Sequence, residues 1–564
     1  MIKTINKPVI IAVVFLLLLQ GILLAYLNWA TSLNRTEVGH LGAAVYFWKT
    51  GRFDVFHVNP PLTRMIDGLP ILLAAPEYDW KSYSPRPQDR SEWSLGSSFV
   101  NANTPETIRW YTFLSRCSLI PLILLGGWFG YRFASELYGP VSGIVFLILW
   151  TFSPLILGWG ATLCPDVVSA SFGIIAVYAF WHWLKAPTWK TATYAGVTLG
   201  LLPLTKMTWI VAFPLWVVLW GIWKFRNFKQ FTVILLLALY VINMGYGFDG
   251  SFRLLKEYKF LSQSLTGNKV NEKSFATKPG NRFEKSWLGH VPVPLPAEFV
   301  QGIDTQKRDF ERGIESYFRG VTSPHGWWYY YPYTLLIKEP LGVWGLLLMA
   351  IFVSCFIKNY NSSWRDEFTL IFPMVSLLVF ISSQTGFSIH PRYIVLVLPF
   401  AYLWVSKLGQ AFARKQVLLS ILTTTLLAWV VGSSLWCYPH SMSYFNESIG
   451  GAKNGPKHLL GSNVDWGQNL YFLKAWYEKN PEKRPITIAY SGPESLERLG
   501  IKTETTIPED LKPGWYVIGV NELYGSKQYE RFRSMEPACR IGWGICVYRV
   551  TEGEVESAEA TENE

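Results

Sequence analysis

Polar and charged side chains interrupt an apolar sequence at a few places where their types could carry chemistry. The first is Glu37, shortly after the first apolar run, in segment 34–40. A carboxylate there can act as a general base, because an alcohol must lose its proton to become a strong nucleophile. An exposed acid at a helix start, stabilised by the helix dipole, is the alternative explanation.

Asp166 is the second candidate, in Cys164-Pro165-Asp166 at the start of another apolar run. Ionisable residues at a membrane boundary are functional candidates by default. An Asp at this place also fits a helix N-cap, where its side chain accepts a hydrogen bond from a backbone N–H group. Both interpretations stay open at the level of the sequence.

Two cationic groups follow at the boundaries of later apolar runs. Lys206 lies between two such runs, and His390 and Arg392 belong to segment 388–393. The planar fork of an arginine matches phosphate oxygens, and together the three side chains could stabilise a phosphate leaving group. Lys206 needs an anion beside it, and either a lipid phosphate or a nearby carboxylate would serve.

A rigid turn is the remaining candidate. His57 and Asn59 precede Pro60 and Pro61, which prevent a helix and favour extended backbone. Such a turn can hold neighbouring polar groups in place, although two prolines by themselves usually mean a loop.

Cysteine spacing predicts no metal centre, since no paired CxxC and no HExxH pattern occurs. Six cysteines are too few for a disulfide framework. Cys539 and Cys546 could join two strands of a hairpin in an oxidising compartment. We therefore expect no cofactor, and a divalent metal is possible without being indicated.

The elements that must position these residues are membrane helices. The chain of 564 residues is 50% hydrophobic and only 16% charged, whereas soluble domains carry about 25% charge. Apolar runs predict about eleven transmembrane helices at roughly 20 residues each. The net charge of +11 comes from bases that lie mostly between these runs, as the positive-inside rule expects, and this argues against nucleic acid as a partner. The runs lie near 8–30, 113–133, 141–160, 167–184, 191–204, 207–223, 230–246, 336–357, 368–387, 391–406 and 416–436.

The short basic connections place the N-terminus in the cytoplasm and the long polar segments outside. The prediction is a membrane module over residues 1–436, with outer loops 31–112 and 247–335. Residues 437–550 read as a small extracytoplasmic α/β domain, with strands near 486–490 and 515–520. The acidic end, 551–564, is predicted to be disordered.

Taken in order, the candidate residues resemble the GT-C family of dolichyl- or polyprenyl-phosphate-sugar transferases. This family includes protein O-mannosyltransferases and lipid A aminoarabinose transferases. The matching features are an acid in the first outer loop, a Pro-Pro-Leu turn, a Pro-Asp pair, a Gly-rich run ending in Thr-Lys, and a late His-x-Arg-Tyr. Here they are Glu37, 59–62, Pro165-Asp166, 195–206 and 390–393.

The resemblance implies Glu37 as the catalytic base, with Asp166 orienting the acceptor or the sugar. It implies that Lys206, His390 and Arg392 contact the donor phosphate. The aromatic segment with Trp327, Trp328 and Tyr329, together with His57 and Asn59, could line an acceptor or lipid cavity; an interfacial belt is the alternative for the aromatic residues.

Two departures separate this chain from its relatives. Where many relatives have an Asp-Glu pair, this chain has Thr36-Glu37, which leaves one carboxylate. Where the aminoarabinose transferases have a lysine before Pro-Pro-Leu, this chain has Asn59. The second difference removes a phosphate-binding cation and weakens the link to the aminoarabinose substrate.

These observations predict a mainly α, polytopic helical membrane protein of the GT-C type with a small α/β C-terminal domain. The expected activity is transfer of a sugar from a polyprenyl-phosphate lipid to a hydroxyl of a protein, lipid or glycan, in a bacterial inner membrane. A polyprenyl-lipid or solute transporter is the main alternative, although transporters usually place charges near the bilayer midplane and show repeats. A non-catalytic assembly or binding protein is a weaker third possibility.

Overall fold

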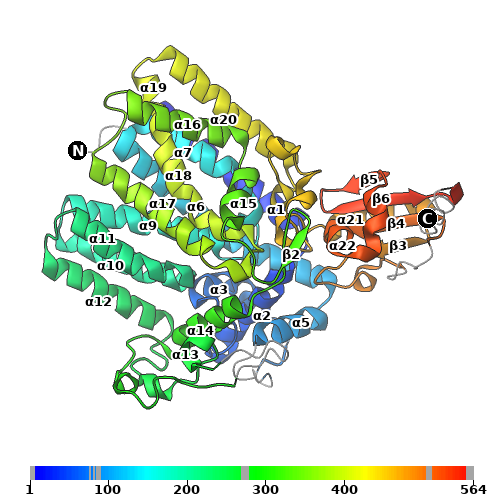
Figure 1. Cartoon of the computed structure of the whole chain (residues 1–564), viewed down its shortest axis with the longest axis horizontal. Helices are drawn as coiled ribbons and strands as arrows, with labels where there is room; N and C mark the ends of the chain where they lie inside the picture. Colours follow the sequence, from blue (N-terminus) through cyan, green and yellow to red (C-terminus); the bar gives the residue numbers. More distant parts are fainter. Residues whose placement is uncertain are drawn as a thin grey trace.

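The apolar runs of the sequence form the helices of one bundle, and a small sheet domain lies at one side of it (Figure 1). The computed structural model describes residues 7–74, 76, 78–80, 83, 90–268, 278–503 and 511–553. Most of the predicted disordered end, 551–564, lies outside these described residues. The N-terminal end of α1 and the sheet domain lie on opposite sides of the molecule in Figure 1.

Five helices of the described chain are long and apolar enough to cross a membrane. Two further pairs of helices count as spans only if each pair, bent by 55° or 105° at a short break, is taken as one span. The five are α1 (Lys7–Ala30), α6 (Pro105–Tyr138), α9 (Asp166–Lys185), α12 (Phe228–Gly245) and α20 (Val417–Cys437). The bent pairs are α7 (Pro140–Phe152) with α8 (Pro154–Gly160), and α15 (Tyr330–Lys338) with α16 (Leu341–Phe356).

The count of about eleven spans is therefore higher than the number of uninterrupted apolar helices. Each of the eleven predicted runs is mostly helical, but several are short, broken or charged. Ser153-Pro154 and Glu339-Pro340 break two of them, because proline removes a backbone donor and ends the preceding helix. The remaining helices of the bundle are α10 (Trp189–Thr205), α11 (Ala212–Ile222), α17 (Trp364–Ser382), α18 (Leu398–Val405) and α19 (Gln410–Ala413).

The two long loops form short helices at one end of the bundle (Figure 1). Helix α2 packs closely on α5: an added Cβ on Gly96 would lie 2.1 Å from the Val38 carbonyl oxygen. Only a glycine permits such an approach of two backbones. These helices are α2 (Arg35–Thr50), α3 (Pro61–Asp67), α4 (Leu69–Leu73), α5 (Ser91–Ala102), α13 (Gln263–Thr266) and α14 (Ala297–Arg312).

The C-terminal domain contains a four-stranded sheet in the order β3-β4-β6-β5. Its strands are β3 (Ile486–Ala489), β4 (Gly514–Gly519), β5 (Cys539–Ile541) and β6 (Ile545–Val550), with α21 (Leu470–Lys479) and α22 (Val520–Gly525) beside them. The two predicted strands are thus confirmed. A separate hairpin, β1 (Ser316–Phe318) with β2 (Val321–Ser323), precedes α15.

The predicted hairpin of Cys539 and Cys546 exists, but the two cysteines are free. Cys539 is paired with Val547, and Cys546 with Arg540. Because side chains alternate along a strand, this register sends the two thiols to opposite faces of the sheet.

Candidate active site

Three charged side chains from separate parts of the sequence meet at one end of the bundle. Asp166 is the first residue of α9, Lys206 directly follows α10, and Arg392 lies in the 3-10 turn Pro391–Leu396. Lys206 Nζ forms an ion pair with Asp166 Oδ1, and Arg392 Nε lies 3.6 Å from Asp166 Oδ2. Two cations therefore share one carboxylate.

This charge cluster, defined as Asp166, Lys206 and Arg392, is largely buried. The three side chains are 1%, 10% and 11% exposed, respectively. Charges in such surroundings are poorly screened, so the excess positive charge acts strongly on a bound anion. The anion beside Lys206 is thus a carboxylate of the protein, which is one of the two possibilities that the sequence left open. Because this one carboxylate pairs with two cations, the cluster keeps one positive charge without a partner inside it.

Aromatic and polar groups surround the two cations. Lys206 Nζ lies 4.4 Å from the centre of the Tyr393 ring. Arg392 Nη1 lies 3.1 Å from both Thr36 Oγ1 and Cys164 Sγ. Thr36 thereby joins the start of α2 to the charge cluster.

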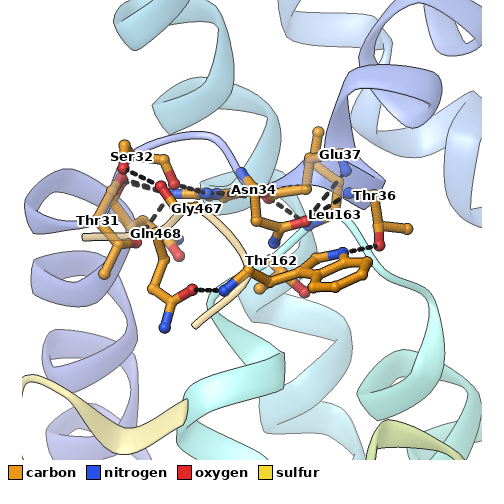
Figure 2. Close-up of polar contacts among 12 residues, drawn as sticks. Thr31, Ser32, Asn34, Thr36, Glu37, Thr162, Leu163, Gly467 and Gln468 are labelled. Carbon is orange, nitrogen blue, oxygen red and sulfur yellow. Dashed lines mark hydrogen bonds and ion pairs between the residues drawn. The ribbon is translucent and has the colours of Figure 1, made fainter. Parts of the chain in front are cut away.

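Glu37, the neighbour of Thr36 in the chain, has a saturated set of hydrogen bonds, and Figure 2 shows those with Asn34 and Leu163. It is fully buried, and its Oε1 accepts from Arg116 Nε at 2.7 Å and from the Leu163 backbone N–H at 2.9 Å. Its Oε2 accepts from Arg116 Nη2 at 2.6 Å and from the Asn34 N–H at 2.8 Å, which completes a capping box at the start of α2. Glu37 therefore lies at a helix start, as one interpretation of the sequence predicted, but its carboxylate is buried rather than exposed.

A C-terminal segment that includes Trp466 and Gly467 forms hydrogen bonds with the start of α2 and the residues before it. Trp466 Nε1 donates to Thr36 Oγ1 at 2.9 Å, and the Arg35 N–H donates to the Trp466 carbonyl oxygen at 2.9 Å. Ser32 Oγ donates to the Gly467 carbonyl oxygen at 2.7 Å (Figure 2). His390 is buried close by, with its ring 5.4 Å from that of Trp466.

His390 is held by the C-terminal segment as well. Its Nδ1 lies 2.8 Å from Ser462 Oγ, so one ring nitrogen is engaged. The structure thus brings Asp166, Lys206, Arg392 and His390 to one region of the molecule.

The predicted cavity residues divide into two groups around this centre. His57 Nδ1 lies 2.6 Å from Glu298 Oε2 of α14. An added Cβ on Gly302 of α14 would lie 2.2 Å from the His57 carbonyl oxygen and 2.1 Å from Met207 Cε. The turn that contains His57 therefore lies close to Met207, the residue after Lys206. In the same turn, the Asn59 carbonyl oxygen accepts a hydrogen bond from Arg64 Nη2 at 2.6 Å.

The aromatic segment lies on another side of the centre. The Trp327 N–H donates to Ser388 Oγ at 3.3 Å, two residues before His390. Trp328 is 67% exposed and Tyr329 is 38% exposed, so both fit a surface belt better than an enclosed cavity wall. Trp327 is the member of the three that is partly buried.

Sequence reasoning assigned no role in the site to Arg116, Thr36, Tyr393 or Trp466. Arg116 had a visible signal, because a charged residue inside an apolar run needs a partner. Trp466 had none, since its contact with Thr36 spans 430 positions of sequence. In the described part of the chain, no three His, Cys, Asp or Glu side chains converge to hold a metal ion.

Comparison with known proteins finds a family model that matches part of the chain. Residues 115–245 match the family model described as dolichyl-phosphate-mannose-protein mannosyltransferase, a region that contains Arg116, Asp166 and Lys206. The match covers less than a quarter of the chain and shows a likeness of this region to membrane glycosyltransferases. A search of curated proteins found no match to this chain.

Two crystal structures of ArnT from Cupriavidus metallidurans are similar to this chain. One is bound to undecaprenyl phosphate, with 11% identity, and the other is in the apo state, with 12% identity. Both have a TM-score of 0.45, and each comparison covers 96% of this chain and 97% of the other. The likeness is loose but extends over most of both chains.

Proposed function

We propose that this protein is a glycosyltransferase that moves a sugar from a polyprenyl-phosphate lipid to a hydroxyl group on the extracytoplasmic face of the membrane. The charge cluster carries this proposal: Lys206 and Arg392 share one carboxylate in a nearly buried site. A lipid-linked sugar phosphate is an anion that such a pair of cations would bind. The description of the matched family, which names a dolichyl-phosphate sugar, supports the same class of donor.

The residues have separate roles in this proposal. Lys206 and Arg392 contact the donor phosphate, and Asp166 holds the two cations in place until the anion arrives. When the bond between the sugar C1 and the phosphate oxygen breaks, the phosphate gains negative charge. Preorganised cations in a poorly solvated site stabilise that charge without reorganising. His390 lies beside Arg392 and adds a polar contact to the same region.

Glu37 is assigned a positioning role. Each of its oxygens already accepts two hydrogen bonds, so an acceptor hydroxyl would have to displace a donor to reach it. By holding Arg116 and the Leu163 N–H, Glu37 fixes the start of α2 against the turn before α9. Thr36 and Asp166 are thereby kept at the places from which they contact Arg392.

The experiment measures consumption of radiolabelled polyprenyl-phosphate-hexose by the purified protein, with membrane extract as the source of acceptor. Asp166→Asn and Arg392→Gln should each lower the rate at least about tenfold, because each removes a charged partner of the phosphate site. Arg414→Gln is the control, since Arg414 is an exposed arginine outside the cluster. A wild type that consumes no donor, or variants as active as the control, would overturn the proposal.

We also place the N-terminus in the cytoplasm and the C-terminal domain outside the cytoplasm, in a bacterial inner membrane. Cys355 at the end of α16 and Lys453 before the sheet domain are both exposed. In single-cysteine variants expressed in intact bacteria, a membrane-impermeant maleimide should label Lys453→Cys and leave Cys355 unlabelled. The reverse pattern contradicts this orientation.

A further inference from the structure

One face of α2 connects the charge cluster to helix α3. Thr36, His40 and Ala44 share this face, because residues four apart in a helix are neighbours. Thr36 Oγ1 contacts Arg392, and an added Cβ on Gly68, directly after α3, would lie 2.8 Å from the Ala44 carbonyl oxygen. His40 therefore lies between the proposed phosphate site and α3.

The His40 side chain is buried without a complete set of hydrogen bonds. It is 1% exposed, and its ring packs 4.6 Å from the ring of Phe56. Within the described residues, its Nδ1 is a buried atom with no hydrogen-bond partner. Leaving such a nitrogen unpaired costs free energy, so its presence in a folded interior calls for an explanation.

Helix α3 brings more unpaired polar atoms to the same contact. Among the described residues, Thr63 Oγ1, Arg64 Nε and both carboxyl oxygens of Asp67 are buried and unpartnered. The guanidinium of Arg64 lies 5.4 Å from the centre of the Phe56 ring, the same ring that His40 contacts. We call His40, Thr63, Arg64 and Asp67 the α2–α3 seam. A hydroxylated ligand entering this seam would supply hydrogen bonds that the protein lacks.

The geometry points to His40 as the proton acceptor for the hydroxyl that receives the sugar, a role that rests on the proposed transferase function. The acceptor oxygen forms a bond to C1 of the sugar while its proton passes to an imidazole nitrogen. The bond between C1 and the phosphate oxygen breaks, and its electron pair leaves with the polyprenyl phosphate. The imidazolium then returns its proton to water.

The carboxylates of Glu37 and of Asp166, the acid of the charge cluster, are already engaged. Glu37 accepts four hydrogen bonds, and Asp166 is bound by two cations. A base in either place would have to lose a partner before it could take a proton. His40 has an unpaired nitrogen within one helical turn of Thr36.

Burial and two nearby positive charges keep the His40 imidazole neutral before the reaction. Burial lowers the pKa of His40 well below its usual value, and the positive charges of Arg64 and Arg392 lower that pKa further. The ring is therefore neutral near pH 7. Its proton arrives as the leaving phosphate beside Arg392 gains a negative charge, so the two charges offset each other. The charges that act on His40 are those of Arg64 on α3 and Arg392. Asp67 on α3 interacts with Arg64 and Glu37, and Glu92 of α5 packs against Gly39, the residue before His40.

The test compares His40→Gln with wild type in the polyprenyl-phosphate-hexose assay described above. The variant should bind the donor lipid as wild type does, measured by native mass spectrometry, and consume it at least about 100-fold more slowly, as expected for a lost general base. His458→Gln is the matched control, since His458 is a half-buried histidine that contacts Tyr333. It should keep the wild-type rate.

A second variant separates proton transfer from packing. Thr36→Asp in the His40→Gln background places a carboxylate one turn away on the same face, and it should restore the rate at least about tenfold relative to His40→Gln. If His40→Gln does not fold, His40→Asn replaces it in both comparisons. A single variant within threefold of wild type, or a double variant that regains nothing, overturns the role of His40 alone. A wild type that consumes no donor overturns the transferase proposal and this one together.

Discussion

At the residue scale, the pair of Glu37 and Arg116 shows how a buried charge can serve position rather than chemistry. Arg116 donates to both oxygens of Glu37 and also to the carbonyl oxygens of Asn28, Thr31 and Ser32. One guanidinium thus joins α6, the end of α1 and the start of α2. Breaking such a pair leaves an uncompensated charge in a buried place.

Glu37→Gln should lower the free energy of unfolding by about 3–5 kcal/mol, the usual cost of removing one partner of a buried ion pair. Combining it with Arg116→Gln should cost less than the sum of the two single changes, because the pair is then removed as a unit. Thermal unfolding in detergent measures both, with exposed Glu284→Gln as the control. A Glu37→Gln protein that melts like wild type but transfers no sugar would instead assign the base to Glu37.

At the element scale, α2 is the helix on which the site depends. It carries Thr36, Glu37 and His40, and glycines let it approach its neighbours. An added Cβ on Gly96 of α5 would lie 2.1 Å from the Val38 carbonyl oxygen, and one on Gly42 would lie 2.9 Å from the Gly96 Cα. Helix α2 thus has a fixed distance from α5.

Gly96→Ala should therefore push α2 away from α5, with a cost of about 1–3 kcal/mol for overpacking. The rate of donor consumption should fall as well, because Thr36 moves relative to Arg392. Gly432→Ala in α20 is a matched control: that helical glycine has no atom within 4 Å of the Cβ position. Equal melting temperatures for the two variants would contradict the packing argument.

At the scale of the whole molecule, polar contacts attach the C-terminal domain to helix α5. Arg498 donates to the Val100 carbonyl oxygen and to Asn101 Oδ1, each at 3.0 Å, at the end of α5. Glu494 lies nearby and is 3% exposed. Burial raises the pKa of Glu494 to about 7, against the lowering effect of Arg498.

This raised pKa predicts a pH dependence with a definite sign. The folded protein binds the Glu494 proton more tightly than the unfolded chain, so the free energy of unfolding falls as pH rises from about 4.5 through about 7. Glu494→Gln should match wild type at pH 5 and be more stable at pH 8, by up to about 3 kcal/mol. Melting curves at the two pH values test this, with Glu497→Gln, an exposed neighbour, as the control. A pH-independent difference between Glu494→Gln and wild type would contradict it.

Much of the bundle could be predicted because lipid imposes a strong local rule. Each spanning segment must satisfy its backbone hydrogen bonds internally, so long apolar runs become helices. The number of uninterrupted spans was predicted less accurately, because prolines such as Pro154 and Pro340 break helices inside apolar runs. The strands of the C-terminal domain were visible because alternation and β-branched residues are local signals.

The sequence by itself determined the class of protein and drew attention to Asp166, Lys206, His390 and Arg392, because charged side chains are costly near a membrane and therefore rare. Only the tertiary structure decided which charges meet. It gave Lys206 and Arg392 a common partner, enclosed Glu37 with Arg116, and left His40 with an unpaired nitrogen. Hydrogen bonds act over about 3 Å, whereas these partners are separated by tens to hundreds of residues, so no local pattern in the chain encodes them.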